Sequence, residues 1–307
     1  MGICESNRRH SDRVKIDGVI KNLSFDFLFE GSIKSPITEK YKLEETKIYH
    51  NSFNQVVIGT DESGKKYAIK IIKKKTILMG QLLANKVRLG TMINHPNILG
   101  VKEVYEDLKN ISVVMDYCEG GDLFDYIIKN PEEKLDDLKS IDILIQILNT
   151  LDYLHNQLKI CHRDIKPENF LITFDEQNRP ILKLIDFGMA HDIKRGGKMK
   201  GKIGTIMFMA PEIIMDKPYD EKVDLWSTGV ILYNMTTGCE PFSQGYEDFK
   251  RIEMQIVNRP INFDKIKNDD LRKLCQEMLE RNPDKRLDAR TALEKAIIIK
   301  KNFNNEN

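Results

Sequence analysis

His-Arg-Asp-Ile-Lys-Pro-Glu-Asn, at residues 162–169, is the stretch that decides the fold of this 307-residue chain. Asp-Phe-Gly follows it at 186–188, and Ala-Pro-Glu follows at 210–212. Any one of these short motifs could be a turn or the capped start of a helix. Chance is a poor explanation for all three in this order and at this spacing. Together they predict one particular catalytic fold.

The polar residues of these motifs suit the transfer of a phosphoryl group, which requires reactants to be positioned and phosphate charge to be neutralised. Asp164, on a loop after the strand-like stretch 158–161, can accept a proton from a hydroxyl group. Lys166 can reach the transferring phosphate. Asn169 and Asp186 offer hard oxygen ligands for Mg²⁺, which binds through few protein groups and through phosphates. The motifs therefore predict a site that uses ATP and magnesium.

From about Tyr41 to about Lys300 the chain resembles the eukaryotic-type protein kinases. Asp224 resembles the buried Asp with which the family holds its catalytic loop, and Arg286 stands where the family pairs an Arg with Glu212. The calcium/calmodulin-dependent group is the most similar, in particular the calcium-dependent protein kinases of plants and protists. Three segments carry this narrower resemblance: 119–125, 198–200 and 219–222.

The resemblance implies an α+β fold of two lobes, with a small, mostly antiparallel β N-lobe and a large helical C-lobe. Apolar spacing agrees, because it predicts a strand at 67–72 and long helices at 138–155 and 223–235. We expect a tether at 1–40, a kinase domain at 41–300 and a short tail at 301–307. Within the kinase domain, the N-lobe is expected at 41–115 and the C-lobe at 119–300.

The resemblance also implies which residues contact the nucleotide. Lys70, in Tyr-Ala-Ile-Lys at 67–70, is similar to the strand lysine that anchors ATP, and Met115 is similar to the gatekeeper before the hinge. The implied catalytic set is Asp164, Lys166, Lys70, Asn169 and Asp186. The implied nucleotide contacts are Ile48, Val56, Ala68, Lys70, Met115, Asp116, Cys118, Asp122, Lys166, Glu168, Asn169, Leu171 and Asp186.

The loop over the phosphates departs from the family pattern. Counting back from Val56, its three glycines should stand at 49, 51 and 54, but the chain has Tyr49, Asn51 and Asn54. Glycine is used there because the backbone approaches the phosphates closely and takes unusual dihedral angles. Asn tolerates left-handed geometry better than most residues, whereas Tyr does not. We therefore expect weaker binding of nucleotide.

A second departure concerns the partner of Lys70, which in the family is a Glu on the following helix. From Ser63 to Lys102 there is no Asp or Glu, and nine residues are Lys or Arg. By family spacing the Glu position holds Lys86. Two ammonium groups about 4 Å apart would repel by roughly 4 kcal/mol at an effective dielectric near 20, so Lys86 should swing away or face solvent. Lys70 would then pair with Asp186, a phosphate or water.

Two carboxylates suggest the substrate. Asp122 and Glu168 match positions at which basophilic members of the group hold a substrate Arg, and a carboxylate can pair with guanidinium through two hydrogen bonds. Asp122 could equally be the N-cap of a helix at 123–128. Thr205 fits the platform that seats a Ser or Thr acceptor. We therefore expect protein substrates with Ser or Thr in a basic context.

The segment between Gly188 and Gly204 contains no Ser, Thr or Tyr, so a phosphate switch has no acceptor there. The segment is instead basic. Its charge could attract an acidic partner, but we favour the interpretation that it is a solvated loop. Similar kinases carry a calcium-sensing module, but no EF-hand pattern occurs in these residues, so we expect no direct calcium site. The basic segment holds His191, Lys194, Arg195, Lys198, Lys200 and Lys202.

The N-terminus, Met-Gly-Ile-Cys-Glu-Ser, fits the pattern for myristoylation at Gly2. One myristoyl chain binds membranes only marginally, and Cys4 offers a palmitoylation site as a second signal. With 48 basic and 47 acidic residues, the chain has no global attraction to nucleic acid. Its five cysteines lack metal spacing and fit a reduced compartment. We expect a cytoplasmic protein held at a membrane by its lipid anchor.

Two functions are compatible with the sequence. The first is a lipid-anchored Ser/Thr kinase, with reduced activity if the altered loop and Lys86 weaken nucleotide binding. The second is a pseudokinase that acts as a membrane-tethered scaffold or allosteric partner. We favour catalysis, because a pure binding protein has little use for an intact set of catalytic groups.

Overall fold

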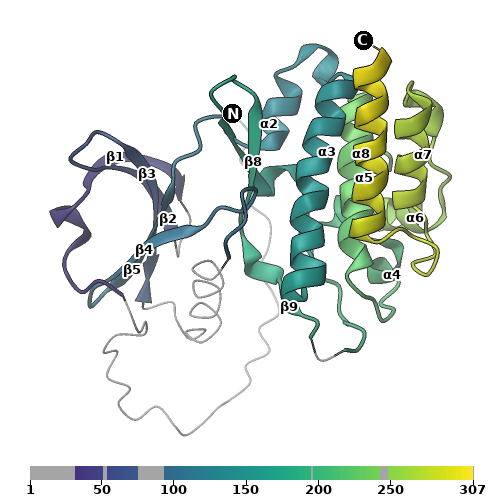
Figure 1. Cartoon of the computed structure of the whole chain (residues 1–307). Helices are drawn as coiled ribbons and strands as arrows, with labels where there is room; N and C mark the ends of the chain where they lie inside the picture. Colours follow the sequence, from purple (N-terminus) through teal and green to yellow (C-terminus); the bar gives the residue numbers. More distant parts are fainter. Residues whose placement is uncertain (1–31, 51–53, 75–92, 195, 243–247, 307) are drawn as a thin grey trace, which may run out of the picture.

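The small lobe is built from apolar segments of alternating pattern, which form one antiparallel sheet (Figure 1). The structure is a computed structural model, and it describes residues 32–50, 54–74, 93–194, 196–242 and 248–306. The strand order is β1-β2-β3-β5-β4. The strands are β1 (Lys42–His50), β2 (Asn54–Thr60), β3 (Lys66–Lys73), β4 (Val101–Glu106) and β5 (Asn110–Asp116).

The register of this sheet places the predicted nucleotide contacts on one face. Val56 lies opposite Lys70, and Ala68 lies opposite Met115. Residues directly opposed in an antiparallel pair point to the same side, as do residues two apart in a strand. Val56, Ala68, Lys70 and Met115 therefore share a face. The other face buries a separate apolar cluster formed by Tyr41, Val57, Ile69, Tyr105 and Val114.

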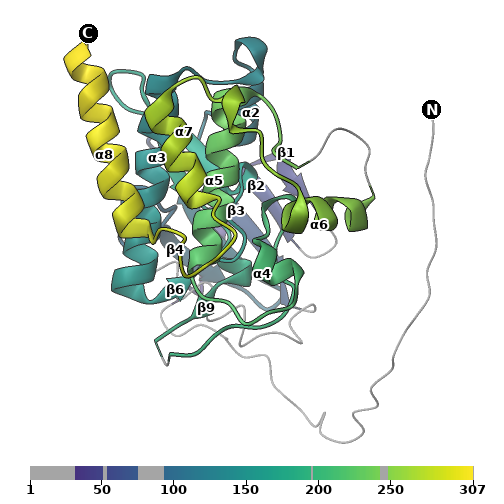
Figure 2. The same ribbon diagram turned by 90° about the vertical axis from the view of Figure 1, so that its right-hand side faces the viewer.

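The large lobe is a group of helices around one extended apolar core. Helix α5 (Lys222–Thr237) is buried along most of its length, and α3 (Asp137–Asp152) packs against it and against α8 (Ala289–Glu306). Figure 2 shows α3, α5, α8 and α7 (Asp269–Met278) side by side. The shorter helices are α2 (Leu123–Ile128), α4 (Pro211–Ile214) and α6 (Phe249–Asn258).

These elements confirm the predicted α+β fold of two lobes. The predicted helix at 138–155 is α3 followed by a π-helical turn at Tyr153–Leu158, and the one at 223–235 is α5. The stretch 158–161 is less extended than its sequence suggests. Lys159 takes a left-handed φ of 58° that ends the helix, so only β6 (Ile160–Cys161) is a strand. It pairs with β9 (His191–Asp192).

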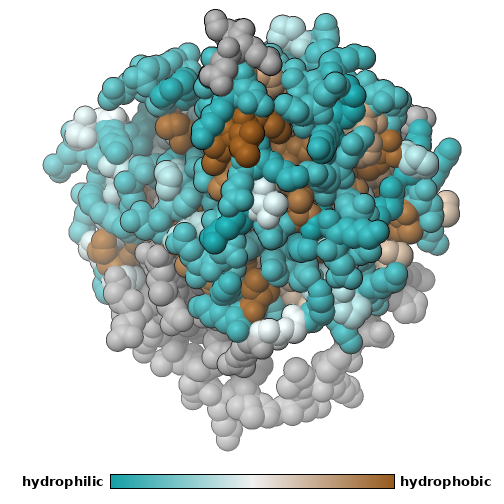
Figure 3. Space-filling model, turned by 45° about the vertical axis from the view of Figure 1, so that its right-hand side comes forward, coloured by the Kyte–Doolittle hydropathy of each residue, from teal (hydrophilic) through white to brown (hydrophobic). Residues whose placement is uncertain are grey.

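The surface is mostly polar. The face in Figure 3 is largely hydrophilic, with small apolar patches that are separate from one another. Such patches are normal for a folded domain, because polar atoms alone cannot cover its surface. Among the helices of the described residues, none combines the length and the apolar character needed to cross a membrane.

Candidate active site

Asp224 of α5 fixes the backbone of the catalytic loop. Its fully buried carboxylate accepts hydrogen bonds from the backbone N–H groups of His162 and Arg163, both at 2.8 Å. These bonds hold Arg163 at a φ of 66°, a strained geometry for a residue other than glycine. Burial raises the pKa of Asp224, but the hydrogen bond with His155 Nε2 at 2.8 Å, the backbone N–H of His162 and the electrostatic effect of these two histidines outweigh it, so this pKa is lowered.

Asp164 stands at the centre of a short hydrogen-bonded chain. The Thr205 hydroxyl donates to Asp164 Oδ1 at 2.8 Å, and the Lys166 ammonium donates to that hydroxyl at 2.9 Å. The Lys166 Nζ also lies 3.5 Å from Asp164 Oδ2. The Asp164 side chain keeps 16% of its surface exposed, so a substrate hydroxyl can approach it. The predicted base, a cation and the predicted acceptor platform thus lie within about 3.5 Å of one another.

The two predicted metal ligands are joined through the backbone. The Asn169 carbonyl accepts from the N–H of Ile185, next to Asp186. The Asn169 side-chain nitrogen donates to the Asp164 carbonyl oxygen at 2.7 Å, which leaves Oδ1 as the atom that can bind a cation. Asp186 takes a left-handed φ of 58°, and its carboxylate accepts from Gly188 N at 2.9 Å. Asp is one of the residues that tolerates this geometry.

This pair of ligands fits magnesium. Within the described ranges, no three or more His, Cys, Asp or Glu side chains are placed to hold a metal ion. Two hard oxygen donors would leave the remaining positions to phosphate oxygens and water, which is how Mg²⁺ is usually bound.

The segment between Gly188 and Gly204, here called the activation segment, contacts the catalytic loop at its end, Gly204. Its φ is +120°, and a Cβ at this position would lie 2.6 Å from the carbonyl oxygen of Arg163. Only glycine allows this approach, which places Thr205 beside Asp164. Further along, Met199 and Tyr219 exchange two backbone hydrogen bonds of 2.7 and 3.0 Å.

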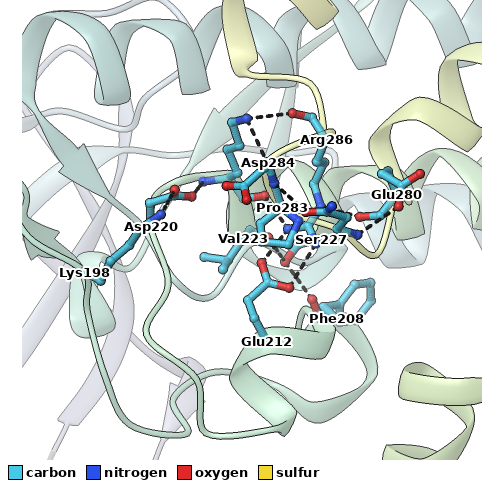
Figure 4. Close-up of polar contacts among 12 residues, drawn as sticks. Lys198, Phe208, Glu212, Asp220, Val223, Ser227, Glu280, Pro283, Asp284 and Arg286 are labelled. Carbon is cyan, nitrogen blue, oxygen red and sulfur yellow. Dashed lines mark hydrogen bonds and ion pairs between the residues drawn. The ribbon is translucent and has the colours of Figure 1, made fainter.

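The described basic residues of this segment are exposed, as a solvated loop requires, but two of them form ion pairs. Lys198 forms an ion pair with Asp220, which Figure 4 shows, and Lys202 forms one with Glu253. The guanidinium of Arg163 donates through Nε to the carbonyl oxygen of Met189 at 2.6 Å. Part of the segment is therefore held by its own contacts.

A buried ion pair ties the end of the segment to the large lobe. Arg286 donates from Nη1 and Nη2 to the two carboxylate oxygens of Glu212 at 2.6 and 2.9 Å (Figure 4). The Arg286 Nε donates to the carbonyl oxygen of Glu280 at 2.8 Å. The guanidinium also lies over the ring of Trp226, 5.2 Å from its centre. The pair implied by the resemblance is present in the structure.

The sheet face that carries Val56, Ala68, Lys70 and Met115 lies where the nucleotide is expected, next to the segment that follows Met115. Asp122 and Leu171 form a backbone bridge, which brings β7 (Phe170–Phe174) beside the segment after the hinge. Cys118 is buried, and burial raises the pKa of its thiol to about 11, so it is neutral. The Asp116 carboxylate, by contrast, is engaged outward by Lys102 and Lys65 at 3.2 and 3.8 Å.

Lys70 lies on the sheet face that carries the other predicted nucleotide contacts. In the part of the chain that the structure describes, no hydrogen bond or ion pair holds its ammonium group. Asp186, one partner considered from the sequence, instead accepts from Gly188. Lys70 is thus available for a phosphate.

Other predicted site residues have the following surroundings. Asp122 is the N-cap of α2 and accepts from Asp125 N at 2.8 Å, Glu168 is exposed, and Ile48 is 52% exposed. The side chains of Tyr49 and Asn54 lie outside the described part of the structure, as do Asn51, Lys86, Gly2 and Cys4.

Two contributors to the site were missed from the sequence. His155 ends an apolar helical run, where a lone His has no distinguishing signal, yet it pairs with Asp224. Ser227 donates its hydroxyl to the carbonyl oxygen of Phe208 at 2.7 Å and so links α5 to the platform (Figure 4). Its position three residues after Asp224 was the available signal.

Comparison with known proteins gives concordant matches. The protein kinase domain family matches residues 44–298. The chain is 37% identical to calcium-dependent protein kinase 4 of Plasmodium berghei over 79% of its length and 46% of that protein. It is also 33% identical to calcium-dependent protein kinase 5 of Plasmodium berghei. That match covers 97% of the present chain and 55% of the Plasmodium protein.

A yeast protein is similar to the same degree. The serine/threonine-protein kinase cds1 of Schizosaccharomyces pombe is 37% identical over 76% of the chain and 52% of its own length. The chain thus spans about half the length of these relatives.

Proposed function

The chain belongs to the protein kinase domain family, and on this premise we propose that it transfers the γ-phosphoryl group of ATP to Ser or Thr of protein substrates. The observation that carries the proposal is the hydrogen-bonded set of Asp164, Thr205 and Lys166, with Asn169 attached to it. A scaffold has no need of a base, a cation and an acceptor platform within hydrogen-bonding distance. The names of the related kinases agree with this activity.

We infer a role for each group, and the geometry supports it. The substrate hydroxyl oxygen forms a bond to the γ-phosphorus as the bond to the bridging oxygen of ADP breaks, and Asp164 takes the hydroxyl proton. Lys166 neutralises charge on the transferring group. Lys70 binds the other phosphates, and Asn169 and Asp186 would hold magnesium. The metal, when bound, supplies positive charge to the phosphate oxygens.

A pseudokinase remains the second candidate. The observations that favour it are the absence of acidic residues from Ser63 to Lys102 and the absence of the three glycines at 49, 51 and 54. Each should weaken the hold on nucleotide without touching the catalytic loop. We therefore infer that these two departures lower the affinity for ATP rather than the rate of phosphate transfer.

The test is phosphate transfer from Mg-ATP to three peptides that differ only in a Ser, Thr or Tyr acceptor. The proposal expects transfer to Ser and Thr, located by mass spectrometry, and none to Tyr. No transfer to any peptide by a folded chain would favour the pseudokinase. Transfer to Tyr alone would contradict the role given to Thr205.

Substrate preference provides a prediction about Asp122 and Glu168. Changing Asp122→Asn and Glu168→Gln together should raise KM about tenfold for a peptide with Arg before the acceptor, because charge-assisted pairs to guanidinium are lost. Asn at 122 still caps α2, so the fold is retained. Steady-state kinetics with the Arg peptide and a matched norleucine peptide measure the effect. An equal rise for both peptides would contradict basic recognition.

Regulation provides another prediction. Because the segment 189–203 holds no phosphate acceptor and is fixed by Lys198, Lys202 and the Met199–Tyr219 bridge, its order should not depend on phosphorylation. Treatment with a broad phosphatase should leave kcat/KM within about twofold of its starting value. Lys198→Ala should lower kcat/KM severalfold, and the exposed Lys301→Ala should not. A large loss of activity after phosphatase treatment would contradict this account.

A further inference from the structure

The edge of the small-lobe sheet is covered by the chain's own N-terminal residues. Ile33 forms a parallel bridge with Tyr105 of β4. Its N–H donates to the carbonyl oxygen of Val104 at 2.8 Å, and its carbonyl accepts from Glu106 N at 3.0 Å. An edge strand leaves a row of backbone groups open to pairing, and here a segment preceding the kinase match occupies part of that row.

Glu106 joins this segment to the strand that carries Lys70. Its side chain is completely buried. Oε2 accepts from Ser32 Oγ and Lys34 Nζ, both at 2.9 Å, whereas Oε1 lies 2.9 Å from Lys74 Nζ, whose side chain is only 3% exposed. A buried charge is retained only when it is paired and hydrogen-bonded. One carboxylate thus binds the N-terminal residues on one side and the end of β3 on the other.

A second carboxylate of β4 holds the other end of the segment. The hydroxyl groups of Tyr41 and Tyr105 each donate to Glu103 Oε2 at 3.0 Å, and Lys40 forms an ion pair with the same carboxylate. Tyr41 is 3% exposed and packs among the apolar residues of the outer sheet face. Residues 32–41, here called the N-terminal clasp, are therefore fastened to one strand at two points.

Lys74 links the clasp to nucleotide binding. Lys70 and Ile72 lie on one face of β3, and Lys74 follows just after the strand, where its N–H donates to the carbonyl oxygen of Lys109 at 2.7 Å. In the absence of acidic residues from Ser63 to Lys102, no carboxylate in that stretch can hold Lys70. The strand β3 pairs along its length with β2 and β5, and Glu106 adds a buried ion pair just after its C-terminal end, on the same side of the chain as Lys70.

We propose that the N-terminal clasp positions β3, and with it Lys70, for binding the phosphates of ATP. Glu106 is the positioning residue, Lys34 and Lys74 balance its charge, and Ser32 donates a hydrogen bond to it. This inference rests on the proposed kinase function. It identifies a segment outside the matched residues 44–298 as part of the nucleotide-binding machinery.

The test compares Lys34→Ala and Ser32→Ala with the parent chain. Lys34→Arg restores the cation, and Lys66→Ala is the matched control, because Lys66 lies on β3 but its contact with Glu44 is exposed and 3.6 Å long. One readout is the Kd for a non-hydrolysable ATP analogue with magnesium. Others are KM for ATP, kcat, and hydrogen exchange of the amides at 70–74.

We expect Lys34→Ala to weaken analogue binding and to raise KM for ATP about fivefold, while kcat changes less than twofold. Exchange of the amides at 70–74 should become faster. Ser32→Ala should show the same changes to a smaller extent. Lys34→Arg and Lys66→Ala should behave as the parent chain.

Unchanged exchange at 70–74 in Lys34→Ala would overturn the proposal. Faster exchange with unchanged analogue affinity would also overturn it, since the clasp would then only stabilise the lobe. A parent chain that binds the analogue but transfers no phosphate would end the kinase proposal and leave the affinity comparison valid. A parent chain that binds no analogue would overturn both.

Discussion

Replacing Asp164 by Asn should lower kcat by about 10²–10⁴, because the side chain can no longer accept the proton of the substrate hydroxyl. The change keeps shape and volume. The Thr205 hydroxyl, 2.8 Å from Asp164 Oδ1, can still donate to an amide oxygen, so the catalytic loop should be retained. The Kd for a magnesium–nucleotide analogue should therefore stay within a few fold of the parent value. Steady-state kinetics and analogue binding on the same samples measure both quantities.

The matched control is Asp269→Asn, which makes the same chemical change at the start of α7, where the side chain is 87% exposed. Its kcat should equal that of the parent chain. If Asp164→Asn retained full activity, Asp164 would not be the base, and the transfer would have to be attributed to another group or to a contaminating enzyme.

Replacing Arg286 by Met should destabilise the large lobe by about 3–5 kcal/mol, because the buried carboxylate of Glu212 is left without its partner. The side chain of Arg286 is 0% exposed and that of Glu212 is 4% exposed, so water cannot compensate. The contact of the guanidinium with Trp226 is lost as well. Urea unfolding followed by the fluorescence of Trp226, the one Trp of the chain, measures the change.

Two further variants separate the causes. Arg290→Met removes an Arg whose pair with Asp152 is largely exposed on the Arg side, so its cost should be below about 1 kcal/mol. Adding Glu212→Leu to Arg286→Met should recover part of the stability, since the unpaired charge disappears. If Arg286→Met and Arg290→Met unfolded at the same urea concentration, the stabilising role of the buried pair would be contradicted.

The fold was predictable because short motifs and apolar periodicity define it locally. The helices α3 and α5 follow from apolar spacing, and the pairing of Glu212 with Arg286 followed from the family resemblance. The register that aligns Val56 with Lys70 agrees with the expected pocket. The individual nucleotide contacts, such as Ile48 and Leu171, stay predictions.

The N-terminal clasp could not be read from the sequence. Residues 1–40 lack a strong local pattern and read as a tether, yet Ile33 pairs with Tyr105, far away in the chain. Glu106 looks like any charged residue at the end of a strand, and nothing local signals that two lysines from distant segments bury it. Pairings of this kind are decided by packing rather than by propensity.

The central claim is that this chain transfers phosphate although it lacks the usual glycines and the helix Glu. The most direct measurement is transfer from Mg-ATP, varied up to several millimolar, to a basic Ser peptide by the purified chain beside Asp164→Asn. The account predicts saturable transfer with a high KM for ATP and almost none in the variant. A parent rate equal to that of the variant at saturating ATP, in a folded sample, would contradict it.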